Sequence, residues 1–350
     1  MDVFEGAKLF VKDCWYVAAW GHEIVEKSLY AISIANEPIV IYRKGNGELV
    51  ALRDQCCHRL APLSRGQLEG DHLRCMYHGL KFASDGRCVE IPGEKKIPDQ
   101  FRVHSYPVVE MHSWVWIWIG DPATSKSHLI PPAIGLEDPQ WSLKAGSMDY
   151  AANYLLINDN LLDLSHVAYV HHKGLRGDGE LQFPVRISKL ERGLNIQRWR
   201  LDQDSAKYIP GSVGGVHDEF LCYDFLMPGI FLMYSGLFER GTAVRCDFGK
   251  PDEKFEPVHA QLSSQAVTGL TDGSSRYFFS VGARRKEHDQ HPGLVELLWN
   301  LTCRFFAEDK EMIEAQQKSI LANPSGQMNS IASDRGPAMM RQIMDKYMNV

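Results

Sequence analysis

The 350-residue chain lacks features that mark several protein classes. It has no basic excess, because 38 Lys and Arg against 44 Asp and Glu give a formal net charge of −6 at pH 7, whereas a nucleic-acid partner favours a basic face. It has no apolar run near the ~20 residues that a membrane span needs. Its start, with Asp2 and Glu5, lacks the basic-then-apolar design of a signal peptide. We therefore expect no nucleic-acid partner and no membrane insertion or export.

Cysteine is scarce for a secreted scaffold. Eight cysteines in 350 residues are too few for a fold held by disulfides, so we expect a reducing cytoplasm. Hydrophobic residues at 44% and charged residues at 23% are ordinary for a globular protein. The length suits about two domains with cores of their own.

Four potential metal ligands are present in two short clusters. Cys56 and His58, then Cys75 and His78, give the pattern C-x-H-x16-C-x2-H. Two thiolates and two imidazoles suit a Rieske [2Fe–2S] cluster, in which one iron takes two Cys and the other takes two His. Zinc is an alternative, although its Cys2His2 sites usually pair C-x2-C with H-x3-H. A third interpretation, two buried cysteines and two ordinary histidines, does not account for four potential ligands in two tight clusters.

Turn signals predict an all-β domain in the first third of the chain. Asn46-Gly47 and Asp85-Gly86 each separate two strand-like runs, which is typical of hairpins. The alternating indoles of residues 114–118 also indicate a strand. A Gly-Asp-Pro sequence at residues 120–122 begins a linker-like segment. We therefore expect an all-β domain over residues 1–121 and a second domain over residues 122–350.

The second domain has a different pattern. Residues 152–169 lack Pro and Gly and show helical spacing of apolar residues, and further helices are predicted over 294–320 and 338–347. Residues 185–285 form strand-like runs. This order predicts an α+β domain, with an antiparallel sheet flanked by helices.

A second metal site is indicated on the first of these helices. His166 lies three positions after Asp163, so the two share a helix face, and His171 lies five positions further on, which requires a helix end or local widening there. Two His and one carboxylate form the facial triad of non-haem Fe(II) oxygenases. The alternative is that these histidines are buried and hydrogen-bonded and have only a structural role. Polar residues within a Leu- and Val-rich face need partners, however.

The third ligand is sought on the predicted C-terminal helix. Asp309 has Phe305, Phe306, Met312 and Ile313 at its helical neighbour positions, so its carboxylate projects from the apolar face. The adjacent Glu308 has charged neighbours, and we interpret it as solvated. Asp309 is therefore the better candidate, with a buried Asp paired to Arg or Lys as the alternative.

At this point the chain resembles the oxygenase components of Rieske non-haem iron oxygenases, over nearly its whole length. It is most similar to the branch of vanillate O-demethylase, dicamba monooxygenase and toluenesulfonate methyl-monooxygenase. Characteristic segments are residues 15–20, 75–82, 90–93 and 117–122, together with an N-x2-D-x2-H-x4-H motif on Asn160, Asp163, His166 and His171. One departure is Cys57, which stands where the family usually has Pro; we interpret it as a small buried filler.

The resemblance implies roles for individual residues. His166, His171 (rather than His172) and Asp309 would hold a mononuclear Fe(II), with Asn160 near it. Asp163 would be the electron bridge between subunits, reaching His78 of the next copy in a head-to-tail homotrimer. Residues 1–121 would be the Rieske [2Fe–2S] domain and residues 122–350 the catalytic domain.

The resemblance also implies a reaction. The chain would be the terminal oxygenase of a multicomponent monooxygenase that uses O2 and electrons from a separate NAD(P)H-dependent reductase, with or without a ferredoxin. The chain itself has no G-x-G-x-x-G fingerprint and no C-x4-C-x2-C spacing. The expected substrate is a small aromatic acid, with O-demethylation of a methoxyarene carboxylate and release of formaldehyde as the main expectation.

Alternatives to this reaction stay open from the sequence. They are hydroxylation of an aryl methyl group, as in an arene sulfonate, aromatic ring hydroxylation, and, more distantly, electron transfer by a Rieske ferredoxin. Weak candidates for substrate contacts are Arg198, Arg200, Arg284, Arg285, Phe231, Tyr234 and Trp299.

Overall fold

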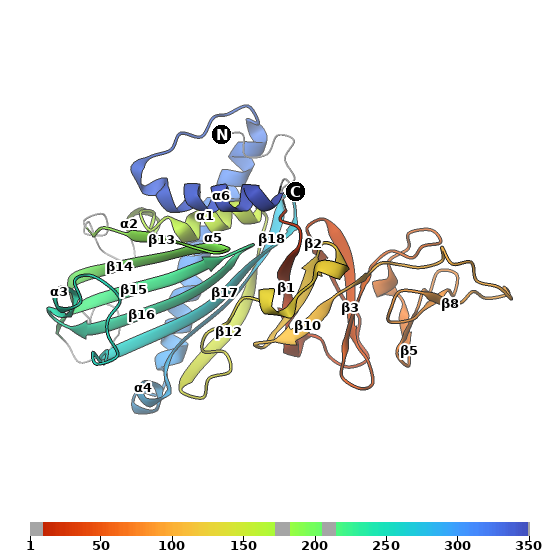
Figure 1. The fold of residues 1–350 in the computed structure, drawn as a ribbon, viewed down its shortest axis with the longest axis horizontal. Helices are drawn as coiled ribbons and strands as arrows, with labels where there is room; N and C mark the ends of the chain where they lie inside the picture. The colour runs from red at the N-terminus through yellow and green to blue at the C-terminus, as the bar shows by residue number, and fades with distance from the viewer. Residues whose placement is uncertain (1–9, 172–182, 205–214, 349–350) are drawn as a thin grey trace. The chain divides into compact units, whose positions relative to one another are not determined.

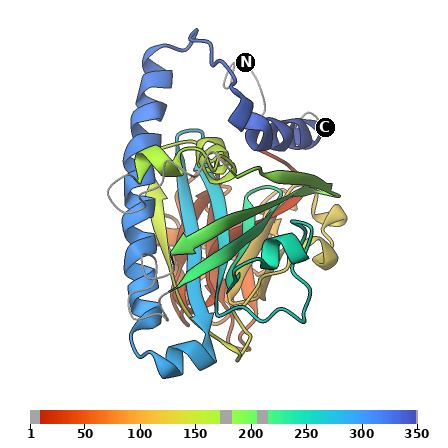
Figure 2. The ribbon, with the colours of Figure 1, turned by 90° about the vertical axis from the view of Figure 1, so that its left-hand side faces the viewer.

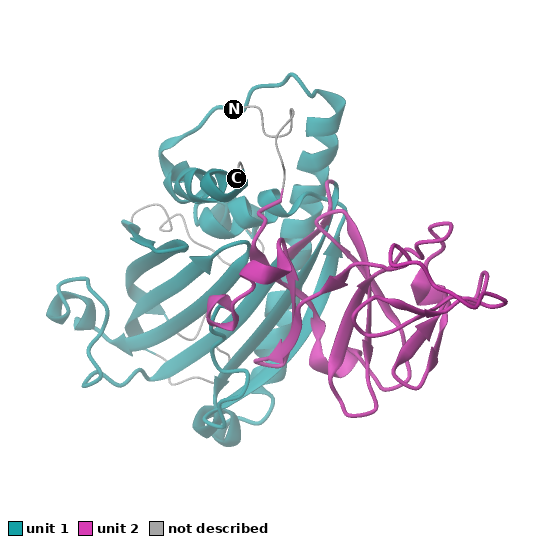
Figure 3. Cartoon of the chain, turned by 45° about the vertical axis from the view of Figure 1, so that its right-hand side comes forward, with its two compact units in different colours: residues 1–8, 131–267, 273–350 teal, residues 9–130, 268–272 magenta. Residues whose placement is uncertain are grey.

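The computed structural model describes residues 10–171, 183–204 and 215–348. The chain divides into two compact units, which Figure 3 colours separately. The smaller contains residues 9–130 and 268–272, and the larger contains residues 1–8, 131–267 and 273–350. The domain boundary expected after residue 121 stays a prediction.

The smaller unit is built from antiparallel sheets, and Figure 1 labels some of their strands. One has the order β1 (Cys14–Trp20), β11 (Trp114–Ile119), β10 (Val108–Met111). The next has the order β2 (Tyr30–Ile34), β3 (Glu37–Arg43), β4 (Leu49–Arg53), β9 (Ser105–Tyr106). The third has the order β5 (Gln67–Glu69), β6 (His72–Arg74), β7 (Lys81–Phe82), β8 (Cys88–Glu90). Short 3-10 turns are η1 (Gly21–Glu23), η2 (Leu63–Arg65), η3 (Pro122–Thr124) and η4 (Ser127–Leu129).

Both hairpin predictions in this unit are confirmed. β3 and β4 pair across the Asn46-Gly47 turn, and β7 and β8 pair across Asp85-Gly86. The two glycines have φ of 87° and 80°, a region that costs a residue with a Cβ but not glycine. The predicted strand over the indoles is β11, and all six of its residues are buried.

The larger unit is organised around a seven-stranded antiparallel sheet. Its order is β12 (Trp141–Tyr150), β18 (Ser274–Arg284), β17 (His259–Thr271), β16 (Ile230–Glu239), β15 (Val216–Leu226), β14 (Gly193–Asp204), β13 (Arg186–Leu190). The predicted α+β class with an antiparallel sheet and helices is confirmed.

The helices of this unit surround the sheet. They are α1 (Tyr154–Leu162), α2 (Val167–Val170), α3 (Thr242–Arg245), α4 (Arg285–Gln290), α5 (Leu294–Ala322) and α6 (Arg335–Met348), with the 3-10 turn η7 (Ala332–Asp334). The long helix α5 runs beside β12 and β18 (Figure 2). The predicted helices over 294–320 and 338–347 correspond to α5 and α6 and are confirmed.

The prediction of one continuous helix over residues 152–169 is wrong. The structure breaks it into α1 and α2, with Asp163 in an extended conformation between them. The Asp163 carboxylate accepts a hydrogen bond of 2.8 Å from the Ser165 backbone N–H. Because an Asp side chain that bonds the backbone two residues on replaces a helical hydrogen bond, it ends α1 locally.

Candidate metal centres

The two Cys–His loops of the smaller unit have the same backbone hydrogen bonds. In each loop the cysteine N–H donates at 2.8 Å to the carbonyl five residues on, and the cysteine carbonyl accepts at 2.9 Å from the N–H four residues on. The residue at that fourth position has positive φ in both loops, 57° at Leu60 and 79° at Gly79. Two copies of one turn therefore present the four predicted ligands.

These turns place the thiols inside and the imidazoles outside. Cys56 and Cys75 are each 1% exposed, whereas His58 and His78 are exposed, with ring centroids 4.5 Å apart. The two thiols are therefore buried, and the two imidazoles lie near each other at the surface. This donor set fits a cluster with one iron on the thiolates and the other on the imidazoles.

Burial raises the pKa of the Cys56 thiol to about 12, and the adjacent Cys75 thiol adds to the rise. Metal binding is what removes the proton from a coordinating thiol of this kind. Cys57, between the ligands, is partly buried and packs against the core that contains them. This position agrees with the interpretation of Cys57 as a filler.

The larger unit brings together His166, His171 and Asp309. Their potential ligand atoms all lie within 4.8 Å of one another, and the Asp309 Oδ1 lies 3.4 Å from the Nε2 of each histidine. His166 directly precedes α2, His171 directly follows it, and Asp309 comes from the middle of α5. His171 and Asp309 are 4% and 5% exposed, so these side chains form a buried site. His172 lies outside the described residues.

Both imidazoles are held by their other nitrogen. The His171 Nδ1 lies 2.8 Å from the Glu308 carboxylate, and the His166 Nδ1 bonds to the Asp163 carbonyl oxygen. Partners at Nδ1 fix the tautomer and leave Nε2 for a metal. The interpretation of Glu308 as a solvated residue is therefore wrong, because its side chain is 26% exposed and bonds to His171.

The electrostatics favour an ionised Asp309 carboxylate. Burial acts to raise the pKa of Asp309, but the hydrogen bonds from His166 and His171 outweigh it and lower the pKa to about 2. Two imidazoles and one carboxylate with other positions open are the ligands that non-haem Fe(II) oxygenases use. The residues present therefore fit a mononuclear iron.

The two remaining predicted site residues lie next to this trio. The Asn160 amide donates to the Asp309 Oδ1 at 3.3 Å. Asp163 stands at the break between α1 and α2, where its backbone carbonyl bonds to His166 and its carboxylate to the Ser165 N–H. The side chain of Asp163 is partly exposed.

A cavity of about 360 Å³ opens beside the three potential ligands. Its walls come from the α1–α2 segment, strands β14 to β18 and α5, and they are largely aliphatic and aromatic. The polar lining residues include Arg200, Glu219, Ser235, His259, Gln261, Ser263, Gln265 and Thr302. Of the weak substrate-contact candidates, Arg200 and Phe231 line this cavity; the other five are not part of its lining.

His259 is a cavity residue that sequence reasoning missed. Its Nδ1 lies 2.5 Å from the Glu287 carboxylate, and its Nε2 lies 3.1 Å from the Gln261 side-chain nitrogen. Glu287 is bound in turn by Arg284, which is not part of the cavity lining. No local spacing connects residues 259 and 287, so the pair had no sequence signal.

A two-histidine, one-carboxylate site beside a largely apolar cavity, together with the Cys–His turns, defines an oxygenase of the Rieske type. The Rieske [2Fe-2S] domain family matches residues 14–107, and the vanillate O-demethylase oxygenase C-terminal domain family matches residues 150–349. The chain belongs to the Rieske non-haem iron oxygenases of the vanillate O-demethylase type. The Rieske interpretation of the Cys–His clusters is thereby confirmed over zinc.

Similar proteins align with this chain over almost its whole length. The toluene-4-sulfonate monooxygenase system iron-sulfur subunit TsaM1 of Comamonas testosteroni is 38% identical over 346 residues, 97% of each chain. The dicamba O-demethylase oxygenase component of Stenotrophomonas maltophilia is 41% identical over 314 residues, 88% of each chain. The crystal structure of dicamba monooxygenase bound to 3,6-dichlorosalicylic acid superposes with a TM-score of 0.85, 27% identity, and coverage of 97% of this chain and 98% of that one.

The chain is accordingly a monooxygenase component, an oxidoreductase with a Rieske cluster and a mononuclear non-haem iron as its cofactors. Its relatives are components of multicomponent systems. Within the described residues, no helix has the length and apolar character to cross a membrane.

Proposed function

We propose that this chain is the terminal oxygenase that demethylates a small methoxyarene carboxylate, with release of formaldehyde. The observation that carries the proposal is the cavity of about 360 Å³ with aliphatic and aromatic walls, which contains the two histidines and one carboxylate in its lining. Pockets of roughly 300 Å³ and more bury small ligands almost completely. Such a volume suits one substituted benzene ring.

In this proposal, Cys56, Cys75, His58 and His78 hold the cluster, and His166, His171 and Asp309 hold the iron. When bound, the cluster supplies single electrons and the iron activates O2 toward a C–H bond of the substrate. A hydroxylated methoxy group collapses to a phenol and formaldehyde, and a hydroxylated aryl methyl group remains as a benzylic alcohol.

The surrounding residues position the reactants. Glu308 and the Asp163 carbonyl fix the imidazole rings, and the Asn160 amide stays on the Asp309 carboxylate. The aromatic side chains of α5 at the cavity, Phe305 and Phe306, exclude water from the reacting carbon.

For the acid group of the substrate, the cavity offers polar partners. Arg200 bonds to Glu219 across neighbouring strands, and His259 is held by Glu287 behind it. Both ring nitrogens of His259 have partners, Glu287 and the Gln261 amide, and this amide carries a second N–H that can donate to an anionic ligand. We assign the carboxylate or sulfonate of the substrate to this polar side.

We further propose a homotrimer in which Asp163 connects His166 to His78 of a neighbouring copy. Support comes from the position of Asp163, whose backbone already bonds to His166, and from the exposure of the His78 ring. Electrons from the reductase, with or without a ferredoxin, then enter at one chain and act in the next. We also propose that the protein works in a reducing cytoplasm, as its low cysteine content led us to expect.

The test is a product screen with the purified chain, a surrogate NAD(P)H-dependent reductase and O2. Methoxybenzoates are scored for formaldehyde, and methylated arene sulfonates for benzylic alcohol. Formaldehyde in step with NAD(P)H consumption supports the proposal. Consumption of NAD(P)H without formaldehyde from any methoxybenzoate contradicts it.

Aryl methyl hydroxylation is the second candidate. The observation that favours it is the 38% identity to TsaM1 over nearly the full length of both chains. Preferential alcohol formation from arene sulfonates would replace the demethylase assignment by this one, and diol or phenol products would indicate ring hydroxylation. An iron content of about three per chain supports an oxygenase, whereas about two, with no turnover, is the value for a cluster alone.

A further inference from the structure

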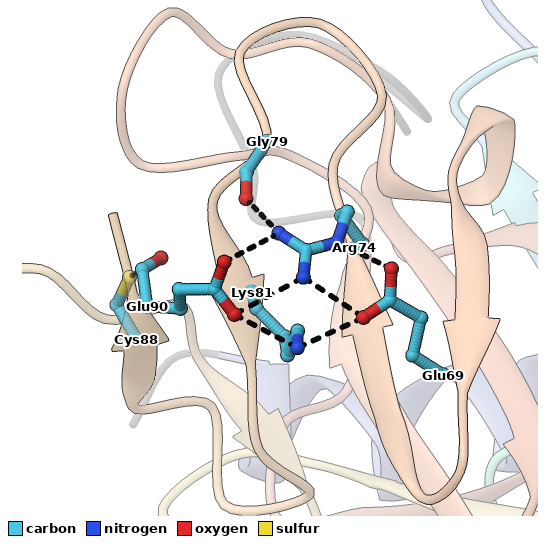
Figure 4. A network of polar contacts seen from close by, with 6 residues as sticks. All are labelled: Glu69, Arg74, Gly79, Lys81, Cys88 and Glu90. Carbon is cyan, nitrogen blue, oxygen red and sulfur yellow. Dashed lines mark hydrogen bonds and ion pairs between the residues drawn. The ribbon is translucent and has the colours of Figure 1, made fainter. Parts of the chain in front are cut away.

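The second Cys–His loop, residues 75–79, is closed by a charged network that the mechanism above does not use (Figure 4). Arg74 stands immediately before Cys75, and its guanidinium bonds to the Glu69 carboxylate at 2.5 and 2.8 Å. It bonds to the Glu90 carboxylate at 3.2 and 3.1 Å. The two carboxylates lie on either side of the guanidinium and hold its plane.

The same guanidinium reaches the far end of the loop. The Arg74 Nη1 donates to the Gly79 carbonyl at 2.6 Å, and Gly79 directly follows His78. One side chain therefore joins the residue before the cysteine to the residue after the histidine. The first loop has Gln55 at the place of Arg74, and a Gln side chain lacks the five-donor fork that this arrangement uses.

The hydrogen bond from Arg74 restricts Gly79, a residue whose backbone is otherwise freer than that of other residues. Its φ is 79°, and glycine has several backbone conformations of similar energy. A Cβ built on Gly79 would lie only 2.7 Å from the Cγ of the Pro92 ring. The hydrogen bond from Arg74 selects one direction for the Gly79 carbonyl and so fixes the backbone next to the His78 ring.

Lys81 provides the contrast within the network. Its ammonium lies 2.8 Å from Glu69 and 2.8 Å from Glu90, and among the described residues it bonds to those carboxylates alone. Arg74 and Lys81 thus carry the same charge to the same two partners. Only Arg74 also holds the loop.

We propose that Arg74 is a positioning residue for His78: it fixes the Gly79 carbonyl and thereby the angle at which the exposed imidazole meets the cluster. The proposal rests on the assignment of His78 as a cluster ligand. Its tests are spectroscopic and need no turnover, so their result is independent of whether the substrate assignment holds. If the wild-type protein itself shows no Rieske spectrum, the assignment of His78 as a cluster ligand is wrong.

The experiment compares Arg74→Lys with the matched control Lys81→Met. Arg74→Lys keeps the charge but loses the fork that reaches Gly79 and both carboxylates together. Lys81→Met loses a charge but leaves the Gly79 contact. We measure the EPR g-values of the reduced cluster, its midpoint potential, and the rate at which an iron chelator removes it, with far-UV circular dichroism to verify the fold.

We expect Arg74→Lys to shift the g-values and to release iron roughly tenfold faster, as for the loss of other partners that orient metal ligands. Lys81→Met should keep the wild-type g-values and iron release, with only a lower potential from its lost positive charge. A folded Arg74→Lys without cluster also supports the proposal. Wild-type behaviour of Arg74→Lys, or equal g-value shifts in both variants, overturns it, because the network would then act through charge alone.

Discussion

The two metal centres of this chain place their ligands in opposite ways. The cluster ligands lie within residues 56–78, come from two copies of one turn, and present both imidazoles at the surface. The iron ligands come from segments 138 residues apart (309 − 171) and meet in a buried site. An exposed electron entrance tolerates water and needs access, whereas a site that activates O2 must exclude both water and stray reductants.

The largest expected effect separates the two centres completely. Asp309→Ala removes the only carboxylate of the trio, so the mononuclear iron should be lost and turnover abolished, while the Rieske spectrum stays unchanged. Iron analysis and visible absorption measure both results on one sample. Retained mononuclear iron would mean that Glu308, the neighbouring carboxylate on α5, is the ligand.

The next effect tests whether the exposed centre serves the buried one. Asp163→Asn keeps the size of the side chain and an oxygen for the Ser165 N–H, but it loses the negative charge that attracts an imidazole. Both metals should remain bound, and product formation should fall by about 100-fold, the upper end for loss of a carboxylate behind metal ligands. Near-normal product formation, measured by chromatography, would contradict the bridge.

A smaller effect concerns only the buried centre. Glu308→Ala removes the partner of the His171 Nδ1, so the ring orientation is no longer fixed and Fe(II) affinity should fall by about tenfold. Glu311→Ala, three residues further along the same helix and exposed, is the matched control and should bind Fe(II) as the wild type does. Titration of metal-free protein with Fe(II) measures both, and equal affinities for the two variants would argue against an orienting role.

The same contrast between local and long-range contacts explains which features could be predicted from the sequence. The cluster motif, the hairpins and the long helix α5 depend on residues close in the chain, and each was predicted. Asp309 was also predicted, because its helical neighbours are apolar and a helix face can be identified from spacing. Long-range pairs such as His259 with Glu287 leave no such pattern.

Two errors have local physical causes. The continuous helix failed at Asp163, whose side chain bonds the backbone of Ser165 in place of a helical hydrogen bond. The interpretation of Glu308 as solvated considered only neighbours on its own helix. Its partner, His171, comes from another segment, at the end of α2, and reaches both Glu308 and Asp309.

The smallest effect concerns the geometry of the exposed centre. Gly79→Ala places a Cβ at φ 79°, where it would lie 2.7 Å from the Pro92 ring, whereas Gly93→Ala has a similar φ of 82° and open space around the new Cβ. Both variants carry the left-handed backbone penalty of roughly 1–2 kcal/mol, so the difference between them isolates the contact with Pro92. We expect Gly79→Ala to unfold at lower denaturant concentration than Gly93→Ala and to shift the cluster EPR signal, which Gly93→Ala should leave unchanged. Equal unfolding midpoints and equal spectra would show that the turn around His78 adjusts freely. They would contradict the interpretation that the loop of residues 75–79 is rigid.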